Sequence, residues 1–557
     1  MAVQEITAAE FTAMIRMASH RLSQNAEFVN SLNVFPVPDG DTGTNMNLTF
    51  QSGYKAVNEA QTTHVGELAQ HLAKGLLMGA RGNSGVITSQ IFRGFAKSVA
   101  AKATLSPQDL AQALADGVTT VYQAVMKPVE GTILTVARGA SEAVTKMSDT
   151  AQTTTDIMTT AVQGAKSALA TTPDLLPVLK EVGVVDSGGQ GLVFIYEGFL
   201  EALGGNISTS DQYQPDEAEM DEMLNAAHHQ SVQTQFNNAD IANGFCTEMM
   251  VQLGQNPTSD DAFDYEEFRN YLNELGDSLL VVADDEVVKV HVHTQHPQKI
   301  FTQGRRYGEL SKIKIDNMRI QHETIVEAEQ KPAAKAQPQL DYGVIAVVSG
   351  KGLQELFQSL GVTTIISGGQ TMNPSTQDIV NAINQCNAQR VLVLPNNGNI
   401  IMAAEQAQEV AKIPVAIIPS KTIAQGMTAL LSFDPNASLS DNQTDMTEAL
   451  STVVSGQITR AIRDSEVDDL QIHQDDYLGI VDNKITVNGT DLLSVCQQML
   501  TRMVGEDSEV VTILVGAAGS QATAQQIVAM IGEQYPDLEC EIHEGDQPVY
   551  PYLIAVE

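Results

Sequence analysis

The 557-residue sequence has no tryptophan, only four cysteines and less than half as many basic as acidic side chains. Its 31 Lys and Arg residues against 68 Asp and Glu residues give a net charge of −37. Non-specific nucleic-acid binding needs clustered positive charge, so we expect no nucleic-acid partner and repulsion from anionic membranes. No apolar run approaches the roughly 20 residues of a membrane-spanning helix, so we also expect no integral membrane association.

The scarcity of cysteine excludes a disulfide framework. Cys246, Cys386, Cys496 and Cys540 lie far apart, and their spacing matches no such pattern. The N-terminal residues lack the basic and apolar regions of a signal peptide, so we expect none. Together these features predict a cytoplasmic protein, and the length predicts two to four domains.

The N-terminal segment, residues 1–204, is predicted to be an all-α domain. Apolar residues recur there at helical spacing in the ranges 11–22, 65–77, 84–101, 107–122, 134–147 and 153–170. Ser106 and Pro107 form a plausible N-cap and first-turn pair. Residues 205–235 are polar and acidic, and we expect a linker there.

Two further domains are predicted after this linker. Residues 236–324 are expected to form a small α/β domain, with strands at 246–253 and 278–294 around a helix near 265–275. Residues 325–340, rich in Pro, Ala, Gln and Lys, are expected to be a second linker. From residue 341 to 557, short apolar runs followed by helical stretches predict an α/β domain of buried parallel strands. The predicted strands are 344–348, 364–366, 391–394, 415–418, 478–481, 510–515 and 553–556.

Residues 33–46 (NVFPVPDGDTGTNM) are the most informative segment. Asp39 and Asp41 lie two residues apart in a loop rich in proline and glycine. Carboxylates at this spacing can ligate one hard cation or bridge two, and Mg²⁺ takes oxygen ligands while leaving room for substrate phosphates. The next residues offer backbone N–H groups and hydroxyls before an apolar run that can open a helix, an arrangement that favours phosphate. The alternative is an ordinary Asp/Gly turn.

Three further glycine-rich loops interrupt the helical pattern, at residues 79–85, 130–135 and 185–191. Asn83 and Ser84 add side-chain donors to the first of them. Four such loops predict a ligand surface at one end of a helical bundle. Helix C-caps and tight turns are the alternative, and they explain any one loop better than all four.

The middle segment contains a second candidate site. His291 and His293 lie two residues apart on a predicted strand, so their side chains would share a face. With Cys246 on another strand they could form a Cys/His₂ site for Zn²⁺, with Glu248 and His296 as further candidate groups. The alternative is a pair of exposed strand histidines.

The C-terminal segment carries one more glycine-rich turn, residues 368–376 (GGQTMNPST). Asn373 is predicted to cap a helix that begins at Pro374. For this turn we favour a binding role over a second active site.

Residues 33–46, 79–85 and 186–191 resemble the nucleotide-binding subunit of dihydroxyacetone kinases, the DhaL type. The resemblance implies an eight-helix barrel that holds ATP and two Mg²⁺ ions, with Asp39 and Asp41 as magnesium ligands. It also implies the nucleotide contacts Thr42, Gly43, Thr44, Asn45, Asn83, Ser84, Gly85, Gly131, Thr132, Asp186 and Gly188.

Two positions depart from that family. Its first aspartate has no match, and Asn33 is the nearest candidate ligand. Its arginine near the nucleotide has no clear match either, and Lys180 is the closest basic residue.

The whole chain resembles the ATP-binding subunits of bacterial fatty acid kinases, the FakA family. Residues 33–46, 244–248 (GFCTE), 291–294 (HVHT) and 368–376 occur together and in that order. The resemblance implies phosphorylation of a fatty acid carboxylate presented by a separate carrier of the FakB type, which gives an acyl phosphate for phospholipid synthesis. It also implies a DegV-like C-terminal domain that docks the carrier, and a homodimer.

The same resemblance strengthens the case for zinc at Cys246, His291 and His293. It allows these residues a catalytic or substrate-positioning role, in addition to the catalytic candidates Asp39 and Asp41. Two other functions stay open. One is a dihydroxyacetone-like kinase acting on a small hydroxyl substrate, and the other is a regulatory protein that binds nucleotide to gate partner docking.

Overall fold

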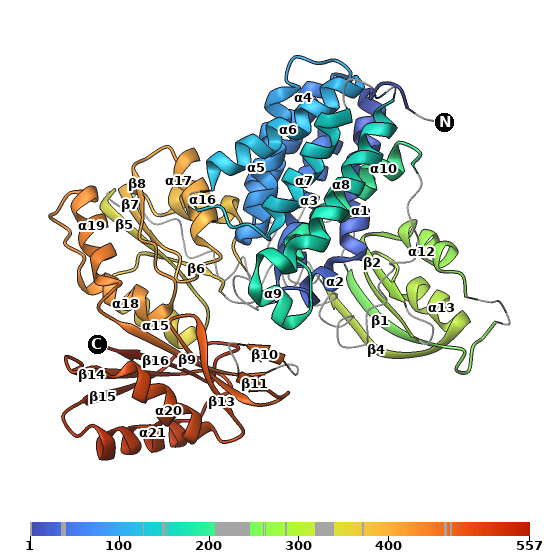
Figure 1. Cartoon of the computed structure of the whole chain (residues 1–557). Helices are drawn as coiled ribbons and strands as arrows, with labels where there is room; N and C mark the ends of the chain where they lie inside the picture. Colours follow the sequence, from blue (N-terminus) through green and yellow to red (C-terminus); the bar gives the residue numbers. More distant parts are fainter. Residues whose placement is uncertain are drawn as a thin grey trace. The chain divides into compact units, whose positions relative to one another are not determined.

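The computed structural model describes residues 3–34, 40–125, 127–147, 151, 153–205, 245–259, 261, 263–283, 287–317, 339–369, 373–461, 465–467 and 470–557. The chain divides into two compact units. One contains residues 1–208 and 339–557, and the other contains residues 209–338. Figure 1 labels their helices and strands.

The N-terminal domain is all-helical, as the sequence predicts. Its helices are α1 (Ala8–Gln24), α2 (Ala26–Ser31), α3 (Thr42–Glu59), α4 (Val65–Gly79), α5 (Gly82–Ser98), α6 (Pro107–Ala124), α7 (Ile133–Met147), α8 (Thr154–Leu175), α9 (Pro177–Val182) and α10 (Ser187–Ala202). Eight of these are long and form the bundle, while α2 and α9 have six residues each. The ring of Phe92 packs edge-on against Phe50 and Phe199 in the core, which favours a single packing arrangement.

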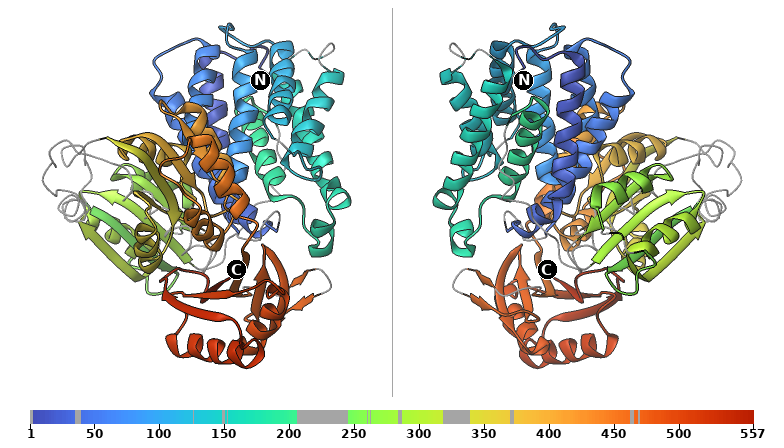
Figure 2. Two further views of the ribbon diagram at one scale, coloured as in Figure 1. Left: turned by 90° about the vertical axis from the view of Figure 1, so that its left-hand side faces the viewer. Right: turned by 90° about the vertical axis from the view of Figure 1, so that its right-hand side faces the viewer.

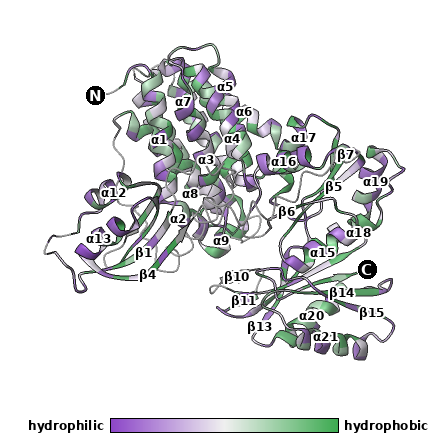
Figure 3. Cartoon of the chain, turned by 180° about the vertical axis from the view of Figure 1, so that it is seen from behind, coloured by the Kyte–Doolittle hydropathy of each residue, from purple (hydrophilic) through white to green (hydrophobic). Residues whose placement is uncertain are grey.

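Local sequence explains most of the helix ends. Ser106 and Asp109 form the capping box at the start of α6, with Pro107 in the first turn, as predicted. Helix α10 was not predicted from the sequence, because glycines occupy its first turn and its remaining residues are apolar on nearly all sides. Figure 3 shows hydrophobic and hydrophilic residues alternating around the outer helices of the bundle. No helix among the described residues is long and apolar enough to cross a membrane.

In the middle unit, the described residues form a four-stranded antiparallel sheet and two helices. Its elements are β1 (Phe245–Leu253), α12 (Tyr265–Asn273), β2 (Gly276–Ala283), β3 (Val287–Thr294), α13 (Pro297–Tyr307) and β4 (Gly308–Asn317). The strand order is β2-β3-β1-β4. The single strand predicted at 278–294 is instead two strands, β2 and β3, that pair antiparallel. Phe268 of α12 and Ile300 of α13 pack on the sheet and form its core.

The first half of the C-terminal domain is a parallel sheet covered on both faces. Its elements are β5 (Leu340–Val348), α15 (Lys351–Ser359), β6 (Thr364–Ser367), α16 (Thr376–Gln385), β7 (Ala388–Leu394), α17 (Ile401–Val410), β8 (Val415–Ile417), α18 (Ile423–Leu431) and α19 (Leu439–Ala449). The order is β6-β5-β7-β8 and the pairings are parallel, as predicted. Alternate residues of β5 join two cores, one with α16 and α17 and one with α15, α18 and α19.

The second half has a different sheet. It contains β9 (Val454–Arg460), β10 (Ser465–Val467), β11 (Leu470–Ile472), β12 (Tyr477–Val481), β13 (Lys484–Gly489), α20 (Leu492–Met503), β14 (Val510–Val515), α21 (Gln521–Gln534), β15 (Glu539–Glu544) and β16 (Tyr552–Val556). Six strands follow the order β13-β12-β9-β16-β14-β15. Helices α20 and α21 cover one face of this sheet, and this part of the chain has the red tones in Figure 2. The prediction that the parallel pattern continues here was wrong, because of these pairs only β14 and β15 are parallel.

One of these antiparallel pairs, β12 and β13, is joined by a two-residue turn. Asp482 and Asn483 occupy it with φ of 45° and 65°. Two consecutive residues of positive φ form the turn that joins antiparallel strands directly, without a crossover helix.

The helical and C-terminal domains share one buried cluster. Ala80 and Val86 of the helical domain lie in the same core as Ile379 of α16 and Ala403 of α17. Helix α4 contacts α16, and α5 contacts α17. The structure packs the two predicted domains together at this surface.

Candidate functional site

Four helix N-termini, each preceded by one of the glycine-rich loops, meet at one end of the bundle. The first turn of α3 meets that of α5, because a Cβ placed on Gly82 would lie 2.5 Å from Nδ2 of Asn45. It also meets α10, since a Cβ on Gly191 would lie 2.6 Å from the sulfur of Met46. The glycines thus allow these helix starts to approach one another closely.

Helix α7 completes the group. A Cβ on Gly188 would lie 3.3 Å from Cβ of Ile133, the first residue of α7, and the Asp186 carboxylate accepts a hydrogen bond from the backbone of Ile133. Helix N-termini carry positive partial charge and exposed N–H groups, so four of them together favour a polyanion such as a nucleotide triphosphate.

Asp41 lies directly before α3. Its carboxylate makes no capping bond to the helix, and it accepts a hydrogen bond from the side-chain amide of Asn373. Asp39, its predicted partner, falls outside the described residues. Asn33 is 4% exposed, and its backbone N–H donates to the Asn30 carbonyl.

The first turn of α3 is held by α2. The Asn30 amide oxygen accepts from the backbone N–H of Thr44 at 3.1 Å, and its nitrogen donates to the Thr44 hydroxyl at 3.0 Å. A Cβ on Gly43 would lie 1.9 Å from the carbonyl oxygen of Ala26. Thr42 and Asn45 are buried. The turn is therefore a rigid platform, and the N–H of Thr44 already has a protein partner.

The first turn of α5 is equally constrained. Asn83 donates its side-chain amide to Oδ1 of Asn399 at 3.0 Å, in the C-terminal domain. A Cβ on Gly85 would lie 2.3 Å from the Thr49 hydroxyl. Ser84 is half-buried between them, and its backbone carbonyl accepts from the Thr88 hydroxyl.

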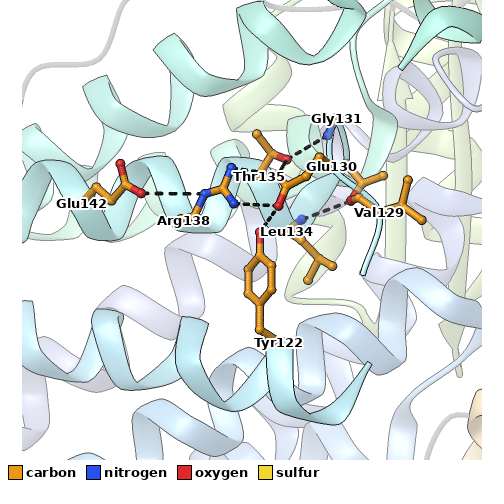
Figure 4. Close-up of polar contacts among 9 residues, drawn as sticks. Tyr122, Val129, Glu130, Gly131, Leu134, Thr135, Arg138 and Glu142 are labelled. Carbon is orange, nitrogen blue, oxygen red and sulfur yellow. Dashed lines mark hydrogen bonds and ion pairs between the residues drawn. The ribbon is translucent and has the colours of Figure 1, made fainter. Parts of the chain in front are cut away.

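The turn before α7 is fixed by a carboxylate network (Figure 4). Arg138 donates to both oxygens of Glu130 at 2.6 and 2.8 Å, and Tyr122 donates to the same carboxylate. The Thr135 hydroxyl donates to Glu130 and accepts from the N–H of Gly131.

The same hydrogen bonds set the electrostatics of this turn. Burial raises the pKa of Glu130, but hydrogen bonds from Thr135 and Arg138 outweigh burial and hold that pKa below its usual range. Burial, with the neighbouring Glu130 charge, raises the pKa of Tyr122 to about 12. Gly131 has a φ of +84°, and the Thr132 hydroxyl donates to the carbonyl of Val129.

Asp186 caps α10. It is 5% exposed, and its carboxylate accepts from the N–H of Gly189 at 2.7 Å. Burial raises its pKa to about 7, although the bonds from Gly189 and Ile133 act in the opposite direction. Because this carboxylate caps α10, a change in its protonation near neutral pH would change the hydrogen bonding at the start of that helix.

Sequence reasoning missed Arg81 and Arg138 in this region, and it assigned Asn373 to a helix cap in place of the bond with Asp41. Arg81 lies inside the glycine-rich 79–85 loop, and this position was the available signal. Arg138 lies outside the sequence motifs and is identified only by its bond to Glu130. Lys180, the basic residue that the sequence offered instead, is 70% exposed at its side chain and pairs with Asp174.

The middle unit brings parts of the second candidate site together in its backbone. Cys246 and His293 are directly paired residues of β1 and β3, and Glu248 pairs with His291. The side chains of Cys246, His291 and His293 fall outside the described residues. Among the described residues no group of three or more metal-binding side chains occurs.

A cavity of about 60 Å³ lies in the C-terminal domain, with Val347, Asn397 and Tyr550 among its lining residues. Its described lining contains no acidic, basic, histidine or cysteine side chain. Phosphoryl transfer requires charged groups around the phosphates, so we place the candidate active site at the helix N-termini and not here.

Comparison with known proteins matches three consecutive segments to family models. Residues 36–201 match the DAK2 domain, residues 242–325 the middle domain of FakA-like fatty acid kinases, and residues 343–557 the C-terminal domain of the same FakA-like proteins.

Similar chains cover the whole length. Protein YloV of Bacillus subtilis is 47% identical over 559 residues, and an uncharacterized protein of Staphylococcus aureus strain USA300 is 45% identical over 557 residues. Each match spans 100% of both chains.

Among solved structures, the dihydroxyacetone kinase from C. freundii in complex with AMP-PNP and Mg²⁺ aligns with a TM-score of 0.28 and 18% identity. That alignment covers 35% of this chain and 34% of the kinase. From the family models and the full-length relatives, the chain belongs to the FakA-like fatty acid kinase family, with a DAK2 kinase domain followed by a middle and a C-terminal domain.

Proposed function

We propose that this chain is an ATP-dependent kinase that phosphorylates the carboxylate of a fatty acid presented by a separate carrier protein of the FakB type. The product is an acyl phosphate for phospholipid synthesis. The observation that carries the proposal is the meeting of four helix N-termini beside Asp41 in a domain that matches the DAK2 family.

The acceptor chemistry fits such a site. A fatty acid carboxylate is already anionic at neutral pH, so one of its oxygens can attack the γ-phosphorus without a general base. The bond between that phosphorus and the β–γ bridging oxygen breaks, and ADP leaves. The main obstacle is repulsion between two anions, which positive helix ends and a fixed in-line geometry offset.

Asp39 and Asp41 are the residues that would hold magnesium. Their carboxylates are hard oxygen donors of the kind this ion prefers. When bound, Mg²⁺ neutralises phosphate charge during the transfer. The chain's own contribution is to fix Asp41 before α3 and to orient the phosphates on the first turns of α3 and α5. Asp39 and Asn33 would complete the ligand set of the two magnesium ions that the family resemblance implies.

We also propose a zinc site at Cys246, His291 and His293 in the middle domain. Its support is the direct pairing of Cys246 with His293, because opposed residues of an antiparallel pair have Cα atoms about 4.5–5.5 Å apart. Thiolate and imidazole are ligands that Zn²⁺ accepts.

Elemental analysis of the purified chain should find zinc, and alanine at any of the three positions should remove it. If the site acts on substrate, these variants lose acyl-phosphate formation more than nucleotide binding. Zinc-free wild-type protein with unchanged activity in all three variants would end this proposal.

The substrate assignment is tested by comparing acceptors. The full chain is incubated with ATP and Mg²⁺, and ADP release is measured with oleate-loaded carrier, with oleate alone and with dihydroxyacetone. We expect turnover only with loaded carrier. Turnover with dihydroxyacetone would favour the small-hydroxyl kinase, and tight ATP binding without turnover would favour the nucleotide-gated regulator.

We propose the C-terminal domain as the docking surface for the carrier and a homodimer as the assembly. The first is measured by carrier capture, comparing the full chain with a chain that ends before residue 341. The second is measured by light scattering of the purified protein.

A further inference from the structure

The C-terminal domain contributes a side chain to the loop before α3, which contains Asp41. Asn373 lies just before α16 and donates its side-chain amide to Oδ2 of Asp41, 332 residues away in sequence. It also lies over the start of α5, because a Cβ on Gly82 would be 3.7 Å from the same amide nitrogen. Asn373 therefore touches two of the four loops that form the candidate site.

Asn373 is not the helix cap that the sequence predicted. Ser375 caps α16 instead, because its hydroxyl accepts from the N–H of Asp378 while the Asp378 carboxylate accepts from the N–H of Ser375. This capping box satisfies the helix start without Asn373. The Asn373 side chain is thereby left for the bond to Asp41.

The backbone around Asn373 is anchored to the kinase domain at two points. Arg81 donates to the Asn373 carbonyl at 2.7 Å and pairs with Asp378 at 3.5 Å. The N–H of Thr376 donates to the carbonyl of Ala80 at 3.1 Å. Burial lowers the pKa of the Arg81 guanidinium, and the neighbouring Asp378 charge acts in the opposite direction. These contacts give the Asn373 amide a defined place.

One polar atom of this arrangement has no partner. Asn373 is 2% exposed, and its Oδ1 makes no hydrogen bond among the described residues. Buried amide oxygens are rarely left unpaired, and such an atom calls for an absent ion or water. An amide oxygen beside the Asp41 carboxylate is a suitable donor for a hydrated divalent cation.

We propose that Asn373 is a positioning residue of the kinase site, supplied by the C-terminal domain. Its amide nitrogen orients the Asp41 carboxylate, and its amide oxygen faces the hydrated divalent cation that Asp41 ligates. The inference rests on the proposed function, because it takes Asp41 as a magnesium ligand. It makes the nucleotide site a composite of two domains.

The test measures Mn²⁺ binding in place of activity. The full chain is titrated with Mn²⁺ in the presence of a non-hydrolysable ATP analogue, and free Mn²⁺ is followed by electron paramagnetic resonance. Asn373→Ala is compared with Asn384→Ala, a change at an exposed asparagine of the following helix α16. Removing a residue that orients a metal ligand typically weakens metal binding about 10- to 100-fold. We expect a loss of that size for Asn373→Ala and wild-type binding for Asn384→Ala.

Asn373→Asp tests the role of the amide oxygen, because it keeps an oxygen that can face the cation and loses the N–H that bonds to Asp41. We expect it to recover part of the Mn²⁺ affinity that Asn373→Ala loses, with Asn373→Ala and Asn384→Ala melting within a few degrees of wild type. Wild-type Mn²⁺ binding in Asn373→Ala would overturn the inference. The inference would also be overturned if Asn373→Ala lost Mn²⁺ affinity together with a lowered melting temperature and Asn373→Asp recovered none of that affinity.

Asp41→Ala distinguishes this failure from failure of the proposed function. If Asp41→Ala weakens Mn²⁺ binding and Asn373→Ala does not, the inference fails and the kinase site stands. If Asp41→Ala binds Mn²⁺ as the wild type does, the metal assignment in the proposed function fails as well.

Discussion

Asp186 is a buried side chain that caps a helix and has a strongly raised pKa. Its contact with the nucleotide stays a prediction, while its place at the start of α10 is defined by the bond from Gly189. Its pKa of about 7 lies above the ordinary value of about 3.9 for an unfolded chain. Between those two values the folded protein binds a proton that the unfolded chain does not.

The stability contribution of Asp186 is therefore present at low pH and is lost as the pH rises from about 4 toward about 7. The substitution Asp186→Asn keeps the capping acceptor and removes the titration, so its stability relative to wild type should increase over the same pH range. Urea denaturation of both proteins across this range measures the difference. A difference that does not change with pH would contradict the buried, titrating carboxyl.

Asp41 is the residue on which phosphoryl transfer should depend most directly. It precedes α3 without capping it, so alanine at this position should leave the fold intact. Loss of one electrostatic group at a charge-bearing site typically lowers the rate about 10²-fold or more. We predict that Asp41→Ala and Asp39→Ala each lower kcat by at least this factor with unchanged circular dichroism. Near-normal activity in both variants would refute the magnesium assignment.

At the scale of elements, local pattern predicts regular helices well and glycine-rich starts poorly. The six helices predicted from spacing all exist, and Ser106 caps α6 as expected. Helix α10 was missed because its first turn is rich in glycine, a residue of low helix propensity. A tertiary contact explains the glycine at position 191, because Gly191 packs on Met46 where a side chain would not fit.

Gly43 offers a test of the same idea at the start of α3. A methyl group at this position would lie 1.9 Å from the Ala26 carbonyl oxygen, so Gly43→Ala must push α3 away from α2. Overpacking typically costs about 1–3 kcal/mol, and the displaced turn should also weaken nucleotide binding.

Gly532→Ala is the matched control, because a Cβ there meets nothing within 4 Å and alanine favours the helix interior of α21. We expect a lowered melting temperature only for Gly43→Ala, measured by calorimetry. Equal melting temperatures for the two variants would contradict the close packing of α2 and α3.

At the scale of the whole molecule, the sequence indicates the fold class of each part but not how the parts meet. Strand and helix patterns are local, so the parallel sheet of the C-terminal domain could be predicted. The bond between Asn373 and Asp41 joins residues 332 positions apart and leaves no local signal. The same holds for Ala80, the C-cap of α4, and Val86 of α5, which share one buried core with residues of α16 and α17.

The shared core predicts that the helical domain depends on the C-terminal domain for part of its stability. A fragment of residues 1–204 would expose Val86, which is buried in the whole chain. Exposing one valine side chain costs about 1.5–3 kcal/mol, so the fragment should unfold at lower temperature than the full chain. Circular dichroism at the helical minimum measures this, and an equal or higher melting temperature for the fragment would refute the shared core.

Transfer of the γ-phosphate to a carboxylate oxygen is the central claim, and an isotope experiment tests it most directly. Oleate labelled with ¹⁸O in its carboxylate is loaded on the carrier and incubated with the chain and ATP, and the product is cleaved with hydroxylamine. Attack at the acyl carbon releases phosphate together with the former carboxylate oxygen. We predict an oleoyl hydroxamate and inorganic phosphate that carries one ¹⁸O atom. Phosphate without the label and no hydroxamate would show that ATP is hydrolysed by water and would contradict the account.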